Sequence, residues 1–141
     1  MKILLAVDQS DAALAMIDAV LGRRGWFRDA PEFHLAYVHP PIPLGFATRH
    51  VSEELVERYY REETASVLGP AQARLMASGE TCLVHGLVGD PAEALVHLAR
   101  AQGIDLLCVA PHGRSAVANA VLGSVATKLA RISPVPVMFV R

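Results

Sequence analysis

Two glycines and a serine near the carboxyl end of the chain are the residues whose types and spacing best suggest chemistry. Nine residues separate Gly113 from the pair Gly123 and Ser124, and a short helical pattern follows this pair. Glycine lets a backbone approach a ligand without a Cβ. Ser124 is a common N-cap residue, and the positive end of a helix behind it would attract an anion. The stretch therefore outlines a phosphate site, although a turn followed by a helix cap would use the same residues.

The elements on either side would position this stretch. Residues 104–110 form a nearly continuous apolar run, which is typical of a strand buried on both faces of a parallel sheet. After the helical pattern, Pro134 and Pro136 end the helix, and residues 137–140 supply one more apolar strand. The stretch is therefore predicted to connect two buried strands through a loop and a helix whose N-cap is Ser124.

The rest of the chain repeats the alternation of strand and helix. Strands are predicted over residues 2–7, 33–39 and 81–85, and helices after Ser10, over residues 51–76 and after Asp90, with Pro91 at the first helical position. Gly69 and Pro70 should kink the long second helix or split it in two. The alternation predicts a doubly wound α/β sheet with helices on both faces and right-handed crossovers, in one domain spanning residues 1–141.

Length and composition narrow the class of protein. The chain has 141 residues, of which 52% are hydrophobic and 19% charged, which is enough to build a core without staples. A net charge of −1 argues against a nucleic-acid surface. The apolar run at residues 3–7 is too short for a signal peptide or a membrane span and ends at Asp8, so we expect a cytoplasmic protein that does not bind membranes.

Neither the cysteines nor the histidines carry a metal-binding pattern. Cys82 and Cys108 lack CxxC spacing and fall on strands that should not be neighbours, so both are expected to be reduced and buried. His39, His85 and His112 lie at or just after the carboxyl ends of strands, but these strands are not all adjacent and no carboxylate joins them at ligand spacing. We therefore expect no metal site built from protein side chains alone.

The whole chain resembles the universal stress protein family. The spacing of Gly113, Gly123 and Ser124, followed by residues 133–137 (SPVPV), looks like the ATP-binding signature of that family. Further marks of the resemblance are residues 3–10 (ILLAVDQS), residues 37–40 (YVHP), Gly86 and residues 89–92 (GDPA). The family motif begins with another glycine three positions before Gly113, and this chain has Ala110 there.

The resemblance implies a Rossmann-like sheet of the adenine nucleotide alpha hydrolase type, with five parallel strands in the order 3-2-1-4-5. Ligands bind such sheets where the winding reverses, which here is between the first and fourth strands. The resemblance further implies that the protein binds ATP with Mg²⁺ and acts as a regulatory stress-response protein. The base and ribose would lie near Ala6, Asp8 and Val38, and the phosphates near a loop and helix start formed by Ala110, Gly113, Arg114, Gly123, Ser124 and Val125.

A homodimer is expected through the last strand. This strand is apolar and should lie at an edge of the sheet, where an unpaired strand is an aggregation hazard. Pairing with a second copy would close the edge, and members of the family that the chain resembles dimerise through this region. The sequence does not identify any further protein partner.

Two interpretations from different classes stay open. In the first, the chain is an ATP-binding regulatory protein; slow ATP hydrolysis is a variant of it, but no general base can be named, so no catalytic residue is assigned. In the second, Ala110 makes the chain a nucleotide-free dimerisation module of the same fold. Other enzymes are disfavoured, because the chain lacks a Walker sequence and a GxGxxG turn, and residues 113–116 lack the last glycine of a nucleophile elbow.

Overall fold

Strands and helices alternate throughout the described residues, 1–42, 52–112 and 122–141, of the computed structural model. In chain order they are β1 (Lys2–Ala6), α1 (Asp11–Leu21), the short 3-10 helix η1 (Arg24–Trp26), β2 (Glu32–His39), α2 (Glu53–Ala77), β3 (Cys82–Val88), α3 (Pro91–Gln102), β4 (Leu106–Val109), α4 (Ser124–Ile132) and β5 (Val137–Phe139). All five predicted strands are present. Their ends differ by a few residues, most of all in β3, which continues three residues beyond His85 to Val88.

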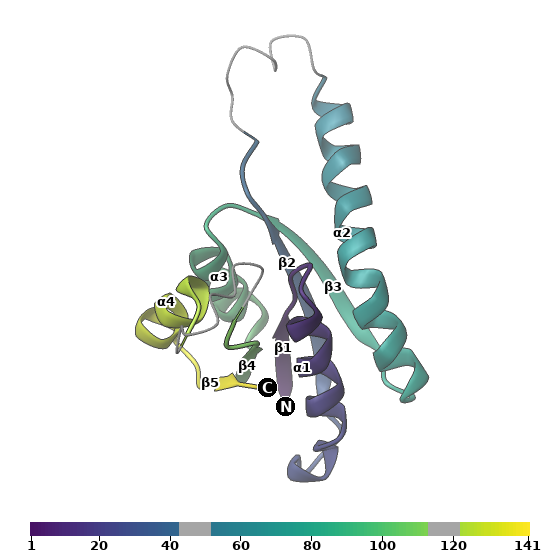
Figure 1. Cartoon of the computed structure of the whole chain (residues 1–141), viewed down its shortest axis with the longest axis vertical. Coiled ribbons are helices and arrows are strands. Elements are labelled where there is room, and N and C mark those ends of the chain that lie inside the picture. The colour runs from purple at the N-terminus through teal and green to yellow at the C-terminus, as the bar shows by residue number, and fades with distance from the viewer. Residues whose placement is uncertain (43–51, 113–121) are drawn as a thin grey trace.

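The strands form one sheet in the order β3-β2-β1-β4-β5, and every neighbouring pair is parallel. This confirms the expected fold class and strand order. The chain winds outward from β1 through β2 to β3, and then in the opposite direction from β4 to β5, so the winding reverses between β1 and β4. In Figure 1, α1 and α2 cover one face of the sheet, and α3 and α4 cover the other.

The two faces of the sheet carry separate cores because successive strand residues point to opposite sides. Ile3, Leu5, Phe33 and Leu35 pack against α1 and α2. Leu4, Ala36, Leu107 and Val109 pack against α3 and α4. The sheet is therefore buried on both sides, as the continuous apolar runs of its central strands predict.

Two helix starts that the sequence predicts are confirmed by their hydrogen bonds. The Ser10 hydroxyl accepts from Ala13 N at 3.2 Å and caps α1. Asp90 Oδ1 accepts from Glu93 N at 3.0 Å and caps α3, with Pro91 at its first position. Gly103, whose φ is +63°, then ends α3 in the left-handed conformation that glycine adopts most easily.

The prediction for the start of α4 is wrong by one residue. Gly123 is the N-cap and Ser124 is the first helical residue, so the Ser124 side chain does not cap the helix. Gly123 has φ −69° and ψ 165°, an extended conformation that leads into a helix without a side-chain acceptor. The N-cap residue of α4 therefore offers no side-chain acceptor of the kind that Ser10 and Asp90 supply to α1 and α3.

The alternative that Gly69 and Pro70 split the second helix is also wrong, because α2 runs unbroken from Glu53 to Ala77 with Pro70 inside it. An internal proline costs about 3 kcal/mol. The flanking residues Val67, Leu68 and Leu75 are buried against the sheet. Each buried side chain of this size contributes about 1.5–3 kcal/mol, so packing outweighs the cost of the proline.

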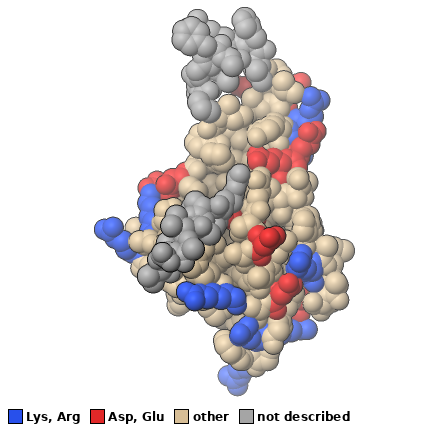
Figure 2. Space-filling view, viewed as in Figure 1, with Lys and Arg blue, Asp and Glu red and all other residues tan. Residues whose placement is uncertain are grey.

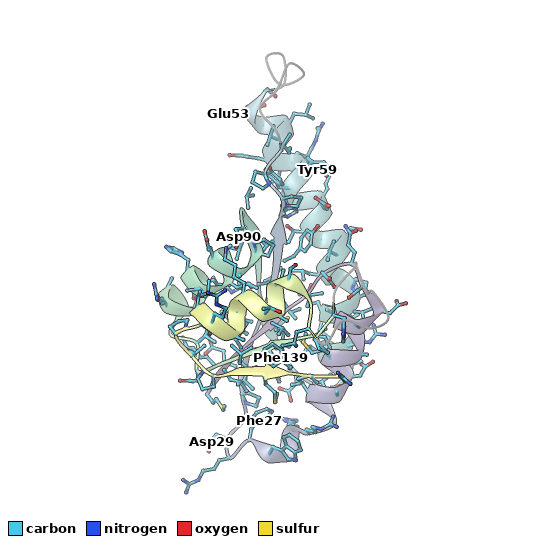
Figure 3. All side chains as sticks on the ribbon, turned by 60° about the vertical axis from the view of Figure 1, so that its left-hand side comes forward. Phe27, Asp29, Glu53, Tyr59, Asp90 and Phe139 are labelled. Carbon is cyan, nitrogen blue, oxygen red and sulfur yellow. The ribbon has the colours of Figure 1, made fainter. Side chains whose placement is uncertain are left out.

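The amino-terminal half of α2 projects beyond the sheet (Figures 1 and 3). The buried residues of α2 all lie in its second half, from Val67 onward, whereas Glu53 and Tyr59 are exposed. On the face shown in Figure 2, the described acidic and basic side chains are interspersed, in keeping with the net charge of −1. No helix in the described part of the chain, α2 included, has the length and apolar character needed to cross a bilayer.

Both cysteines are free thiols. Cys82 lies on β3 and Cys108 on β4, and two strands separate these elements, as expected. Cys108 is fully buried, and its burial raises the thiol pKa to about 12. Cys82 is only half-buried, which corrects the expectation that both thiols are buried; the reason is that β3 is an edge strand.

Candidate functional site

A cavity of about 290 Å³ opens at the carboxyl ends of β1, β2 and β4, where the winding of the sheet reverses. Its volume lies close to the lower end of the range for small-molecule sites. Three segments from different parts of the chain border it: residues 6–8 at the end of β1, residues 36–38 of β2 together with Pro40, and residues 109–112 at the end of β4. The start of α4 and one side of α3 complete the walls.

Seven of the nine predicted site residues line this one cavity. They are Ala6, Asp8, Val38, Ala110, Gly123, Ser124 and Val125. The other two, Gly113 and Arg114, lie outside the described residues. The fold thus brings together segments separated by more than a hundred positions in the sequence, and their roles in ligand binding stay a prediction.

Asp8 brings a carboxylate to the cavity and also shapes the turn that leads into α1. Its Oδ1 accepts hydrogen bonds from Ser10 N at 3.0 Å and from the Ser10 hydroxyl. These bonds hold the side chain in place at the end of β1. Asp8 is the only acidic residue among the described residues that line the cavity.

The start of α4 forms the opposite side of the cavity. Gly123, Ser124 and Val125 all line it, and Gly123 N donates to Pro111 O at 2.7 Å, which ties α4 to the segment after β4. Because no side chain among the described residues caps α4, its first amide groups and the positive end of its dipole are suited to an anion. The φ of −69° at Gly123 excludes a left-handed backbone as the reason for glycine there.

Ala110 also borders the cavity and adopts an ordinary backbone conformation. Ala110 belongs to the described residues, and none of these other than glycine has a positive φ. A position that required positive φ would have strained alanine. The backbone at Ala110 therefore accommodates alanine without strain.

The remaining walls are mostly apolar, and the sequence analysis did not assign them. They include Ala36, Pro40, Pro91, Leu95, Pro111 and His112. Pro40 and Pro91 follow the carboxyl ends of β2 and β3, so the rule that ligands meet parallel sheets at these ends could have found them. Leu95 comes from the interior of α3 and carries no local signal of this kind.

An ion-pair network holds α3 and α4 together beside the cavity. Lys128 Nζ lies 3.0 Å from Asp90 Oδ1 and 2.8 Å from Glu93 Oε1. The hydrogen bond from the Glu93 backbone, followed by that from Lys128, lowers the pKa of Asp90, and the two carboxylates raise the pKa of Lys128. All three side chains are at the surface, so the network fixes geometry more than it stabilises the fold.

The histidines considered for a metal site point to different places. His39 faces α2 and bonds to Glu63, His85 lies on the opposite face of the sheet and bonds to His34, and His112 lines the cavity. Within the described residues, no group of three histidine, cysteine or acidic side chains is placed to hold a metal ion. His34 bonds to both His85 and Glu32.

Comparisons with known proteins agree with this geometry. The sequence pattern of the Universal stress protein family matches residues 1–141. A universal stress protein of Thermus aquaticus is 30% identical over 139 residues, covering 99% of this chain and 97% of the relative. The solved structure of UspA from Lactobacillus plantarum has a TM-score of 0.79 at 19% identity, over 100% and 97% of the two chains. A solved universal stress protein in complex with cAMP has a TM-score of 0.65 at 27% identity, over 100% and 96%.

Proposed function

Because the chain belongs to the universal stress protein family, we propose that it is a regulatory protein that binds ATP in the cavity between β1 and β4. The observation that carries the proposal is the convergence of two kinds of surface in one cavity. Ala6 and Val38 supply an apolar side suited to a base, and Gly123 and Ser124 supply a helix start suited to phosphate.

Nucleotide binding by a similar protein supports the choice of ligand class. The solved universal stress protein complex with cAMP holds an adenine nucleotide in a protein of this fold. ATP is the finer proposal for this chain. It rests on the spacing of Gly123 and Ser124 from Gly113 and on the glycine N-cap of α4, which leaves room for a phosphate.

Mg²⁺ would accompany the triphosphate. This cation prefers oxygen ligands and is usually held by one or two carboxylates, with phosphates and water completing its shell. Asp8 lies on the base and ribose side of the proposed site, so phosphate oxygens and water would hold the cation. The chemistry that Mg²⁺ would supply is neutralisation of phosphate charge, whereas Asp8 and the amides of α4 would orient the ligand.

The protein would act as a homodimer paired through β5. This strand lies at an edge of the sheet, and Phe139 on it is 37% exposed. An exposed apolar edge strand is a template for pairing with another chain. The mass measured by light scattering at micromolar concentration should be that of a dimer, and a monomer would contradict this part of the proposal.

Native mass spectrometry and calorimetry test the nucleotide. The purified protein should carry ATP or bind it when titrated, more tightly with Mg²⁺ than with EDTA. AMP and cAMP serve as comparison ligands, because they contain the base without the triphosphate. If neither the purified nor the titrated protein binds any adenine nucleotide, the proposal is wrong.

Ala110 separates this proposal from the alternative of a nucleotide-free module. Because its backbone is unstrained, we expect its Cβ only to crowd the ligand, at about 1 kcal/mol, or about fivefold in affinity. Ala110→Gly should therefore tighten ATP binding modestly. Binding that appears only in Ala110→Gly would identify the natural protein as the nucleotide-free module.

A further inference from the structure

A cluster of polar side chains joins α2 to the ends of β1 and β2 on the face of the sheet opposite the start of α4. At its centre, Glu63 Oε2 lies 2.8 Å from His39 Nδ1, and Glu63 Oε1 accepts from the Tyr37 hydroxyl at 3.2 Å. His39 Nε2 lies 2.7 Å from the Thr64 hydroxyl, and Gln9 Nε2 donates to Glu63 Oε1 at 3.4 Å. We refer to Gln9, Tyr37, His39, Glu63 and Thr64 as the Glu63 cluster.

The bonding pattern fixes one proton position in this cluster. A carboxylate only accepts, so His39 donates from Nδ1 to Glu63, and its Nε2 shares a second hydrogen bond with the Thr64 hydroxyl. Burial raises the pKa of Glu63, but the hydrogen bonds from His39 and Tyr37 outweigh burial and hold this pKa below its usual range. His39 is 1% exposed, so its bonds to Glu63 and Thr64 are shielded from water and are the strong links of the cluster. The bond from Gln9 is long and exposed, so it is the weak link.

The strand residues of the cluster are immediate neighbours of residues that line the cavity. His39 stands between Val38 and Pro40, both of which border the cavity, and Gln9 follows Asp8. Tyr37 borders the cavity and bonds to Glu63. Because successive strand residues point to opposite faces, a movement of β2 at Val38 also moves His39 on the other face.

On α2, the cluster marks the place where the helix leaves the sheet. The buried residues of α2 begin at Val67, whereas residues 53–62 are exposed or half-buried and project beyond the sheet (Figure 1). Glu63 and Thr64 anchor the helix at this point, and the nearby Tyr60 adds a contact in the projecting part: its hydroxyl accepts from Ile42 N at 3.2 Å and its ring packs edge-on against His39. Gly86 on β3 allows this anchor, because a Cβ there would collide with the Thr64 hydroxyl and lie 3.2 Å from Thr64 Cγ2.

We propose that Glu63 is a positioning residue that couples occupancy of the nucleotide cavity to the order of residues 53–62 of α2. A ligand that holds Asp8 and Val38 in place also holds Gln9 and His39, and through Glu63 it restrains the projecting helix. Linkage makes the effect reciprocal, so restraining the helix favours the ligand. The projecting part of α2 becomes a surface whose order reports the nucleotide. This inference rests on the proposed function.

Hydrogen exchange followed by mass spectrometry, with calorimetry on the same samples, tests the coupling in the full chain with and without ATP and Mg²⁺. The variants are Glu63→Gln and Glu63→Ala. The matched controls are Glu62→Gln and Glu62→Ala, since the neighbouring Glu62 is 73% exposed and pairs only loosely with Arg58, at 3.9 Å.

ATP should slow exchange in residues 53–62 of the parent and of both Glu62 variants. Glu63→Ala should abolish this protection and weaken ATP binding about fivefold or more, and Glu63→Gln, which keeps one acceptor for His39, should reduce both effects. If Glu63→Ala does not fold, the coupling is tested by comparing the ATP-induced protection in Glu63→Gln with that in Glu62→Gln. A purely structural role would lower stability without removing the response of α2 to ATP.

Outcomes in the parent or in the variants can overturn the inference while leaving the proposed function intact. One is a parent that binds ATP with no change of exchange in residues 53–62. The other is ATP-induced protection that survives in both Glu63 variants or is lost equally in the Glu62 variants. A parent that binds no ATP refutes the proposed function itself, and the coupling falls with it.

Discussion

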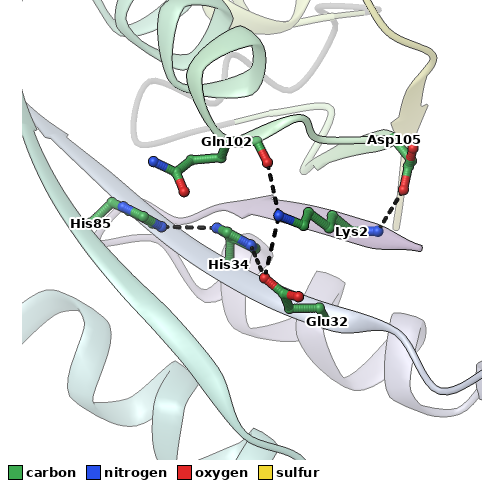
Figure 4. Close-up of polar contacts among 6 residues, drawn as sticks. All are labelled: Lys2, Glu32, His34, His85, Gln102 and Asp105. Atoms are coloured by element: carbon green, nitrogen blue, oxygen red, sulfur yellow. Dashed lines mark hydrogen bonds and ion pairs between the residues drawn. The ribbon is translucent and has the colours of Figure 1, made fainter.

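The strand β2 carries a buried histidine near each end, and the two residues have different surroundings. His39, near the carboxyl end, bonds to Glu63 and Thr64 of α2 beside the cavity. His34, near the amino end, bonds through Nδ1 to His85 Nε2 at 2.9 Å and through Nε2 to Glu32 Oε1 at 3.0 Å (Figure 4). Both rings are almost inaccessible to water, at 1% and 0% exposure.

The two histidines differ in which elements they connect. The partners of His39 come from a helix far along the chain, so it links separate elements next to a site. The partners of His34 are residues of β2 itself and of the neighbouring strand. Lys2 joins the same network through Glu32 at 3.8 Å and the Gln102 carbonyl at 3.1 Å. In parallel sheets ligands meet the carboxyl ends, so we assign the His39 end to function and the His34 end to structure.

The largest expected effect is at the carboxyl end, in Gly123→Val. The added side chain would occupy space that the phosphates need, and affinity for ATP should fall by at least about a hundredfold, or ~2.7 kcal/mol. Stability should fall by no more than about 1 kcal/mol, because the extended backbone of Gly123 suits valine although valine is a poorer N-cap than glycine. The control is Gly25→Val in η1, which is not part of the cavity lining. A Cβ at Gly25 has nothing within 4 Å, so this variant should bind ATP as the parent does. If calorimetry gives Gly123→Val and the parent the same affinity for ATP, the start of α4 does not bind the phosphates.

His39→Leu should lower the free energy of unfolding by about 2–3 kcal/mol, because it leaves the Thr64 hydroxyl and one oxygen of Glu63 without their buried partner. It should also weaken ATP binding, since β2 loses its tie to α2. Urea denaturation gives the stability and calorimetry the affinity. A variant as stable as the parent would show that the Glu63 cluster does not hold α2.

His34→Leu should have a smaller effect, about 1 kcal/mol or less. Leucine fills the apolar space, and the freed carboxylate of Glu32, at 51% exposure, can bind water instead. ATP affinity should not change. The contrast between the two ends of β2 fails if His34→Leu costs as much stability as His39→Leu or weakens ATP binding to the same degree.

The smallest expected effect is the pH dependence of stability that arises from His85, the partner of His34. Burial, and then the nearby His34, lower the pKa of His85 in the folded protein. The unfolded chain therefore takes up a proton first, so the contribution of His85 is complete above about pH 6.5 and is lost as the pH falls through its lowered value. The slope should stay below about 1.4 kcal/mol per pH unit, the limit for one proton.

His85→Gln should flatten this dependence in urea denaturation between pH 7 and pH 5. The carboxylates with lowered pKa values, Glu63 and Asp90, lose their contributions only below about pH 4.5 and leave this window clear. A slope that persists unchanged in His85→Gln would assign the dependence to another group.

The sequence by itself determined the order of strands and helices along the chain, seven of the described residues that line the cavity, and two of the helix starts. These features depend on local physics or on spacing along the chain. Asp90 followed by Pro91 can begin a helix wherever it stands, and the apolar run at residues 104–110 predicts a buried strand in any doubly wound sheet. The resemblance to a family supplied the strand order, which local patterns do not contain.

Only the tertiary structure decided how distant side chains pair and where local preferences are overruled. Pro70 stays inside α2 because buried neighbours hold the helix to the sheet. Glu63 is one of several similar acidic residues in α2, and nothing in its local sequence marks it as the partner of His39, 24 positions away. That pairing arises because the sheet sets the position of β2 relative to α2, and hydrogen bonds between such elements depend on distances that sequence spacing does not encode.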